Sequence, residues 1–203
     1  MDIRKIITGL TLSLLLGSGV AVAADFDKGR EAYNLGDYET ALAELNPLAQ
    51  RGEARAQHLL GWLHLNRFDP ATAIKWFSLA ADQGHADAQY NLGFMFAKGK
   101  GVPKNIKTAV NWFTLAAEQG DTDSQYNLGQ MYREGKVLPQ NDKTALSWFA
   151  RSWYTKAAEQ GHSKAQYNLA TMYSQGDGVP VCDKTATKWF TLAAEQGEDG
   201  PQY

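Results

Sequence analysis

Residues 88–120 read AQYNLGFMFAKGKGVPKNIKTAVNWFTLAAEQG, and this segment predicts a helical hairpin. Ala88, Leu92 and Phe96 recur at intervals of four, which places them on one face of a first helix. Glycines and a proline then crowd into 99–103, where they would interrupt that helix. The first half of the segment therefore predicts a helix followed by a loop.

The second half of the segment predicts another helix. Asn105 is a favourable N-cap residue, and Gly120 can end a helix because it readily adopts the left-handed conformation. Ala109, Trp112 and Ala116 follow the i, i+3, i+7 spacing of a buried stripe. The tryptophan of this stripe recurs along the chain, and we predict that its copies belong to the core: Trp76, Trp112 and Trp189.

A glycine inside the first helix needs a reason, because it costs about 1 kcal/mol relative to alanine in a helix interior. Gly93 stands beside Leu92, where a small residue would let a neighbouring helix come close. We therefore predict a close helix–helix approach at this position. Its counterparts elsewhere in the chain are equally small: Gly61, Gly129 and Ala170.

The whole hairpin recurs along the chain. The closing phrase reads LAADQG, LAAEQG, KAAEQG and LAAEQG, and the opening phrase varies around AQYNLG. Five repeats fit, followed by the start of a sixth at 199–203; they span about 25–52, 53–85, 86–121, 122–162 and 163–198. One hairpin cannot bury its apolar face alone, whereas stacked hairpins can. The sequence therefore predicts an all-α fold, an α-solenoid with a right-handed superhelical curve.

The repeated pattern resembles the Sel1-like repeat, a relative of the tetratricopeptide repeat. The resemblance is carried by A-x-A-Q-Y-N-L-G-x-M-Y, then G-x-G-V-P, then K-x-A-x-x-W-F-x-x-A-A-E-Q-G. The first unit, GREAYNLGDYETALAELNPLA at 29–49, has a short loop and is more similar to a plain tetratricopeptide repeat. The resemblance implies a scaffold for contacts with another protein or peptide, as in exported bacterial members of the family.

The N-terminus has the layout of a secretory signal peptide at 1–23. Arg4 and Lys5 precede an apolar run, and Ala21-Val22-Ala23 forms a small-x-small cleavage site. We predict cleavage after Ala23 and a single repeat domain at 24–203. The protein would then be periplasmic or secreted and not attached to a membrane. An uncleaved anchor is the alternative, because about 18 apolar residues are near the lower limit for spanning a bilayer.

Composition and motifs argue against several classes of function. A net charge of −2 in 203 residues does not suit a nucleic-acid binder driven by bulk positive charge. His58 and His64 lie six residues apart on one expected helix, so we predict no metal site and no cofactor. Some cysteine-rich Sel1-like proteins are described as β-lactamases, but this chain has one cysteine and no S-x-x-K motif. We therefore expect no enzyme activity.

The outward positions of the first helices should line the concave face of the solenoid. One set lies two residues before the buried leucine, a second lies two residues after it, and a third lies further along. The candidate binding residues are His58, Trp62, Tyr90, Phe94, Lys98, Tyr126, Gln130, Arg133, Tyr167 and Thr171. Packing against the adjacent helix is the alternative role. A further alternative is binding of cell-wall glycan or peptide by the repeated Tyr-Asn pairs: Tyr90, Asn91, Tyr126, Asn127, Tyr167 and Asn168.

Two other surfaces are candidates for contact. The fourth repeat contains its tryptophan phrase twice, so Trp148 and Trp153 cannot share one stripe, and one of them could face outwards on the convex side. At the C-terminus, no complete repeat follows Trp189, Phe190 and Leu192. A solenoid normally ends in a polar cap. We therefore predict an apolar C-terminal face that could meet a partner or a second copy.

Overall fold

The computed structural model describes residues 24–67, 69–137 and 143–197, and these residues form helices and loops without strands. The helices are α1 (Phe26–Leu35), α2 (Tyr38–Gln50), α3 (Ala54–Arg67), α4 (Pro70–Asp82), α5 (Ala86–Lys98), α6 (Ile106–Glu118), α7 (Thr122–Arg133), α8 (Lys143–Glu159), α9 (Ser163–Gln175) and α10 (Asp183–Ala194). This arrangement confirms the predicted all-α fold.

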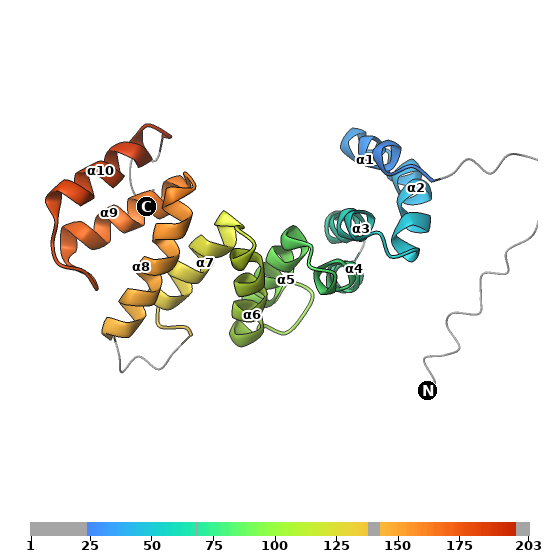
Figure 1. Ribbon diagram of the computed structural model, residues 1–203. Helices are drawn as coiled ribbons and strands as arrows, with labels where there is room; N and C mark the ends of the chain where they lie inside the picture. Colours follow the sequence, from blue (N-terminus) through green and yellow to red (C-terminus); the bar gives the residue numbers. More distant parts are fainter. Residues whose placement is uncertain (1–23, 68, 138–142, 198–203) are drawn as a thin grey trace, which may run out of the picture.

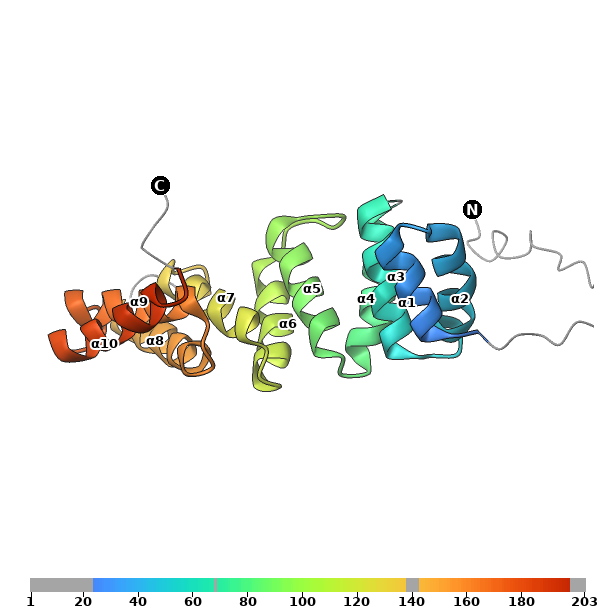
Figure 2. The ribbon, with the colours of Figure 1, turned by 90° about the horizontal axis from the view of Figure 1, so that it is seen from above.

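Consecutive helices pair into five hairpins, from α1–α2 to α9–α10 (Figure 1). The second helix of each hairpin also packs against the first helix of the next, which joins the hairpins into a row. Figure 1 shows this row bent into an arc, with α1, α3 and α5 on its inner side and α2, α4 and α6 on its outer side. Figure 2 shows the same row from above as an elongated body. The molecule is a solenoid.

The predicted start of the second helix at Asn105 is confirmed. Asn105 caps α6, and its side chain accepts a hydrogen bond from the Thr108 amide at 3.0 Å. Asp37 and Asp69 cap α2 and α4 in the same manner. Each cap satisfies amide groups that the first helical turn leaves without partners.

The small residue of the first helix receives an aromatic ring from its own hairpin. A Cβ placed on Gly93 would lie 2.7 Å from the Phe113 ring, and one on Gly61 would lie 2.5 Å from the Phe77 ring. A Cβ placed on Gly129 would lie 2.6 Å from the Tyr154 ring. The predicted close approach is confirmed, and the group that lies against the glycine is the aromatic ring of the second helix. Glycine is needed because no larger residue leaves room for the ring.

The predicted buried stripe of the second helix is confirmed for Ala109 and Ala116, which are fully buried, and is wrong for Trp112. Phe113 is fully buried on α6, whereas Trp112 is only half-buried. Trp112 instead packs against a core cluster formed by α4 of the preceding hairpin and α5 of its own, and Trp76 and Trp189 pack in corresponding places. The phenylalanine or tyrosine that follows each tryptophan closes its own hairpin, and the tryptophan seals the joint between two hairpins.

Buried glutamines provide a second link between hairpins. Gln89 on α5 donates through Nε2 to the carbonyl of Ala81, near the end of α4, at 3.1 Å. Its Oε1 accepts from Nε2 of Gln119, the residue that ends α6, at 2.7 Å. The same two bonds recur three times, in the pairs Gln57–Gln83, Gln125–Gln160 and Gln166–Gln196. Each buried glutamine therefore joins the preceding hairpin to the end of its own.

The two ends of the domain differ. Asp25 caps α1, which begins three residues after the predicted cleavage site. The signal segment at 1–23 and the start of a sixth repeat at 199–203 lie outside the described residues. At the other end Phe190 is only half-buried, although Phe77 and Phe113 are fully buried in the corresponding places. In the described ranges, no helix has the length and hydropathy needed to cross a bilayer.

The glycine contact gives the first prediction. Gly93→Val should lower the free energy of unfolding by about 1–3 kcal/mol, because the added methyl groups overlap the Phe113 ring. Phe113→Ala alone should cost about 3–5 kcal/mol. The double variant should lose less than the sum of the two, because valine fills the space that the ring leaves. Urea unfolding of all four proteins measures the coupling; strict additivity would contradict the contact.

The glutamine link gives the second prediction. Gln89→Leu should lower the free energy of unfolding by about 0.5–1.5 kcal/mol, because it removes the buried bond to the Ala81 carbonyl, which keeps only the Gly84 amide as a donor. Gln119→Ala is the matched control, since it removes only the exposed member of the pair. Its loss should be smaller, since its partner Gln89 still bonds the carbonyl. Equal losses for the two variants in urea unfolding would show that the buried bond contributes no more to stability than the exposed one.

Candidate binding surface

The first set of predicted binding positions is largely occupied by packing. Each ring lies against the aromatic side chain of its own hairpin's second helix, with centroids 5.3–5.9 Å apart. The pairs are His58–Phe77, Tyr90–Phe113, Tyr126–Tyr154 and Tyr167–Phe190. All four residues of the first helices are half-buried. Their main role is to hold the aromatic ring that the small residue admits.

The second set of positions is divided between packing and exposure. Trp62 is half-buried and lies edge-on to Phe77 at 6.0 Å. Thr171 is also half-buried, and its hydroxyl donates to the Tyr167 carbonyl at 3.0 Å. Phe94 is different, because 40% of its surface remains exposed. Among these three residues, Phe94 offers the most accessible apolar side chain to a partner.

Phe94 lies at the rim of a hollow of about 340 Å³, a volume within the usual range of ligand pockets. We call it the α5–α7 hollow. It is lined by Phe94, Ala97, Lys98, Lys104, Ile106, Phe113, Tyr126, Asn127, Gln130, Met131, Glu134 and Lys136. Four predicted binding residues are therefore brought together there: Phe94, Lys98, Tyr126 and Gln130. Lys104, Glu134 and Lys136 were missed, because they lie in loops or at a helix end and not on the expected ladders.

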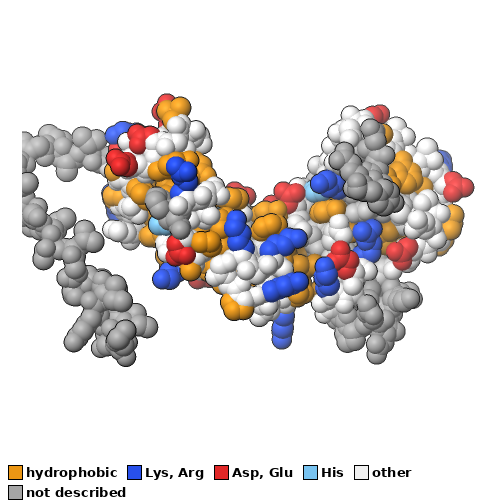
Figure 3. Space-filling model, turned by 180° about the vertical axis from the view of Figure 1, so that it is seen from behind, with side chains coloured by type: hydrophobic (Ala, Val, Ile, Leu, Met, Phe, Trp, Pro, Cys, Tyr) orange, Lys and Arg blue, Asp and Glu red, His pale blue; other side chains and the backbone are white. Residues whose placement is uncertain are grey.

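The rim of the α5–α7 hollow is positively charged. Lys98, Lys104 and Lys136 line it, and Glu134 is the only acidic residue among the lining residues. Glu134 is already paired with Lys136. The chain carries no acidic residue between Asp87 and Glu118, although it has four lysines in that interval. Figure 3 shows Lys and Arg side chains gathered over the middle of the molecule, where Figure 1 places α5 and α6.

A second hollow, of about 480 Å³, continues from α7 towards α9. Tyr126 and Asn127 line both hollows, so α7 forms a shared wall. The other residues that line the second hollow are Tyr90, Asp123, Gly161, His162, Ser163, Lys164 and Gln196. At the end of α7, Arg133 donates to Gln130 Oε1 at 3.3 Å and to Asn168 Oδ1 at 3.4 Å. Arg133 therefore bridges two repeats.

The structure removes part of the support for the alternative role, which is the binding of cell-wall glycan by the Tyr-Asn pairs. Asn91 and Asn168 are buried, with 6% and 9% of their surfaces exposed. Asn91 bonds to His58 and Asn168 to Arg133, so both amides are used within the protein. The repeated Tyr-Asn pairs thus do not form a continuous exposed ladder for a sugar.

The proposed convex contact is wrong for Trp153. This side chain is half-buried and packs against the core cluster that contains Ala109, Phe113 and Leu128. It therefore seals a joint as Trp112 does, and Lys156 lies over its ring at 4.3 Å. The extra residues of the fourth repeat are absorbed because α8 extends over 17 residues. The side chain of Trp148 lies outside what the structure describes.

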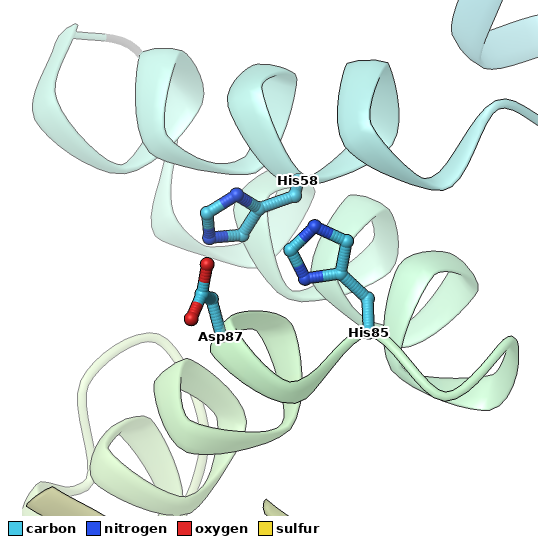
Figure 4. A group of neighbouring side chains, drawn as sticks. All are labelled: His58, His85 and Asp87. Carbon is cyan, nitrogen blue, oxygen red and sulfur yellow. The ribbon is translucent and has the colours of Figure 1, made fainter. Parts of the chain in front are cut away.

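A cluster of titratable side chains lies at the joint between the second and third hairpins. His58 on α3 stacks on His85, which precedes α5, with ring centroids 4.6 Å apart. Asp87 in the first turn of α5 completes the group, and one possible ligand atom from each residue lies within 4.8 Å of the others. Figure 4 shows the three side chains converging. Burial, followed by the neighbouring His85, lowers the pKa of His58 to about 4.

Sequence reasoning missed this cluster because it compared His58 with His64 on the same helix. The relevant partner, His85, is 27 positions away and stands at the start of the next hairpin, as the N-cap residue of α5. A usable signal was present: His58 occupies a ladder position that is tyrosine in the three later repeats. A departure from the internal consensus next to a second histidine marks a candidate site.

Comparison with known families matches the Sel1 repeat at 54–85, 86–121, 122–162 and 163–198. A Sel1 repeat protein from Oxalobacter formigenes superposes with a TM-score of 0.76 at 33% identity, over 85% of this chain and 71% of that one. A protective antigen of uropathogenic Escherichia coli strains with an SLR fold superposes with a TM-score of 0.77 at 31% identity, over 85% of this chain and 38% of that one.

Among curated proteins, DAP3-binding cell death enhancer 1 of Rattus norvegicus is 34% identical over 68 residues. The matched segment is 34% of this chain and 13% of the rat protein. The likeness therefore concerns a pair of repeats and not the whole relative.

Proposed function

The chain belongs to the Sel1 repeat family, and from this premise we propose that it is a non-catalytic scaffold that binds a segment of another protein in the α5–α7 hollow. Sel1 repeat proteins are generally scaffolds for protein–protein interaction. The single observation that carries the proposal is the exposed Phe94 at the rim of a hollow bordered by lysines. In this proposal no residue performs chemistry.

The lining of the hollow indicates the chemistry of the partner. Phe94, Ala97 and Met131 offer an apolar surface for one side chain of an extended peptide. Lys98 and Lys104 stand beside that surface and favour carboxylates on the flanking residues. Extended segments suit such grooves, because alternate side chains enter pockets while the others remain in water. We therefore infer an acidic peptide with an apolar anchor residue.

The third prediction tests this partner chemistry with two peptide sets. Each peptide carries a central phenylalanine or leucine, flanked either by aspartates or by lysines. The aspartate set should bind, and its affinity should fall with added salt because the rim charges are screened. Phe94→Ser should weaken binding by about 30-fold, the effect of losing an anchor contact of about 2 kcal/mol. Fluorescence anisotropy measures both.

Charge reversal provides the matched control for this experiment. Lys98→Glu/Lys104→Glu alters the rim, whereas Lys75→Glu/Lys188→Glu makes the same change in charge at exposed positions outside the hollow. Only the first pair should abolish binding of the aspartate set. An equal loss of peptide binding in both double variants would show that the effect comes from net charge alone. Equal binding of the aspartate and lysine peptide sets would contradict the proposed partner.

We propose further that the protein acts outside the cytoplasm. The basis is the signal-like segment at 1–23, followed at once by the Asp25 cap of α1. A domain that begins so close to the cleavage site needs no linker after export. The binding partner would then be an envelope or secreted protein.

The fourth prediction concerns processing. When the full chain is expressed in a Gram-negative host, the periplasmic fraction should contain a protein that starts at Ala24, as mass spectrometry of the intact protein can show. Ala21→Asp/Ala23→Asp should block cleavage, because the peptidase requires small residues at this site. An intact N-terminus of the unaltered chain in the membrane fraction would support the uncleaved anchor instead.

A further inference from the structure

We propose that His58, His85 and Asp87 form a binding site for a divalent transition-metal ion of the zinc type. One atom from each residue lies within 4.8 Å of the others, and the side chains come from two consecutive hairpins (Figure 4). Two imidazoles and one carboxylate form a ligand set that suits zinc and its neighbours and leaves coordination positions open. The site is separate from the α5–α7 hollow, so the proposal does not rest on the proposed function.

The cluster is particular to one joint of the solenoid. At the joint between the third and fourth hairpins, the corresponding residues are Tyr90, Asp121 and Asp123. At the next joint they are Tyr126, His162 and Lys164. Of these three joints, only the first supplies two imidazoles and a carboxylate. Repeat packing alone does not require that set, because the other joints form without it.

The ring of His85 does not form the helix-capping hydrogen bond that the residues at the corresponding positions form. Asp121 and His162 cap the helices that follow them, accepting from the amides of Ser124 at 2.7 Å and Ala165 at 3.2 Å. His85 occupies the same N-cap position, but in the described structure its side chain makes no capping bond. Its Nδ1 is buried and has no hydrogen-bond partner among the described residues. A buried ring nitrogen without a partner is costly, and a metal ion would satisfy it.

The hydrogen bond at His58 bears on which of its ring nitrogens would hold an ion. The Asn91 amide lies 3.0 Å from His58 Nε2 and can donate to it. Coordination through Nδ1 would keep this bond, and coordination through Nε2 would replace it. Asp87 is exposed and supplies the negative charge at the solvent side.

Ring stacking without a metal is the competing explanation. Tyr126 and His162 stack at 4.7 Å in a corresponding place, close to the 4.6 Å between His58 and His85. Zinc bonds to nitrogen and oxygen measure about 2.0–2.2 Å, which brings ligand atoms to roughly 3.4 Å from one another. The histidine rings must therefore turn towards each other on binding. A decisive experiment has to separate coordination from stacking.

The fifth prediction uses a variant that keeps the stack and removes the ligand. His58→Tyr introduces the residue that the three later repeats carry, so the protein should fold normally. The full chain, stripped with EDTA, is titrated with Zn²⁺ in a calorimeter at neutral pH. The unaltered protein should bind one ion, and His58→Tyr and Asp87→Asn should each weaken binding by at least about 10-fold. His64→Ala and His162→Ala should leave it unchanged.

A spectroscopic measurement completes the test. Co²⁺ bound by two imidazoles and a carboxylate should give visible absorption bands that Zn²⁺ displaces and that His58→Tyr lacks. Circular dichroism should show equal helix content in all variants. Zinc affinity that is the same in the unaltered protein and in His58→Tyr, or no Co²⁺ bands in the unaltered protein, would overturn the proposal and leave stacking as the function of the cluster.

Discussion

A glycine on one helix and an aromatic ring on the next hold each middle hairpin together. The ring of Phe77, Phe113 or Tyr154 rests where a Cβ would otherwise stand, which lets the two helices approach closely along their length. The helical cost of the glycine is about 1 kcal/mol, and burying a phenylalanine contributes about 1.5–3 kcal/mol in return. Once a hairpin has closed, its outer surface has a fixed shape. The tryptophans and buried glutamines then attach the next hairpin to that surface.

This closure also decides which side chains remain for binding. The residue two positions before the buried leucine must cover the aromatic ring, so His58, Tyr90 and their counterparts are half-buried in the four repeats from 53 to 198. The residue two positions after the leucine is less constrained, because it contacts that ring in the second repeat, through Trp62, but is a different residue in each of the others. It can therefore vary, from a half-buried tryptophan at 62 to an exposed phenylalanine at 94. The proposed hollow arises where this free position meets the lysines of the α5–α6 loop and the end of α7.

The repeats and the helix caps could be predicted from sequence because they depend on local rules. Asn105 caps its helix through its own side chain, and Gly93 signals a close approach whatever lies opposite. Periodicity alone could not distinguish Trp112 from Phe113, because adjacent residues on a helix differ by 100° and both lie near the apolar face. The choice depends on the neighbouring hairpin. Lys136 and His85 were missed for the same reason, since their roles depend on residues from another hairpin.

The two proposed sites share helix α5, and this helix determines how binding at one site could affect binding at the other. Asp87 is in the first turn of α5, and Phe94 and Lys98 are in its second half. In a stacked array each repeat contacts only its neighbours, so an ion that joins α3 to α5 acts first on the position of α5. That helix forms one wall of the α5–α7 hollow. A metal ion would thus restrain the wall that carries the apolar anchor, and a partner in the hollow would restrain the helix that carries a ligand. Any such coupling must be reciprocal, because binding free energies are linked.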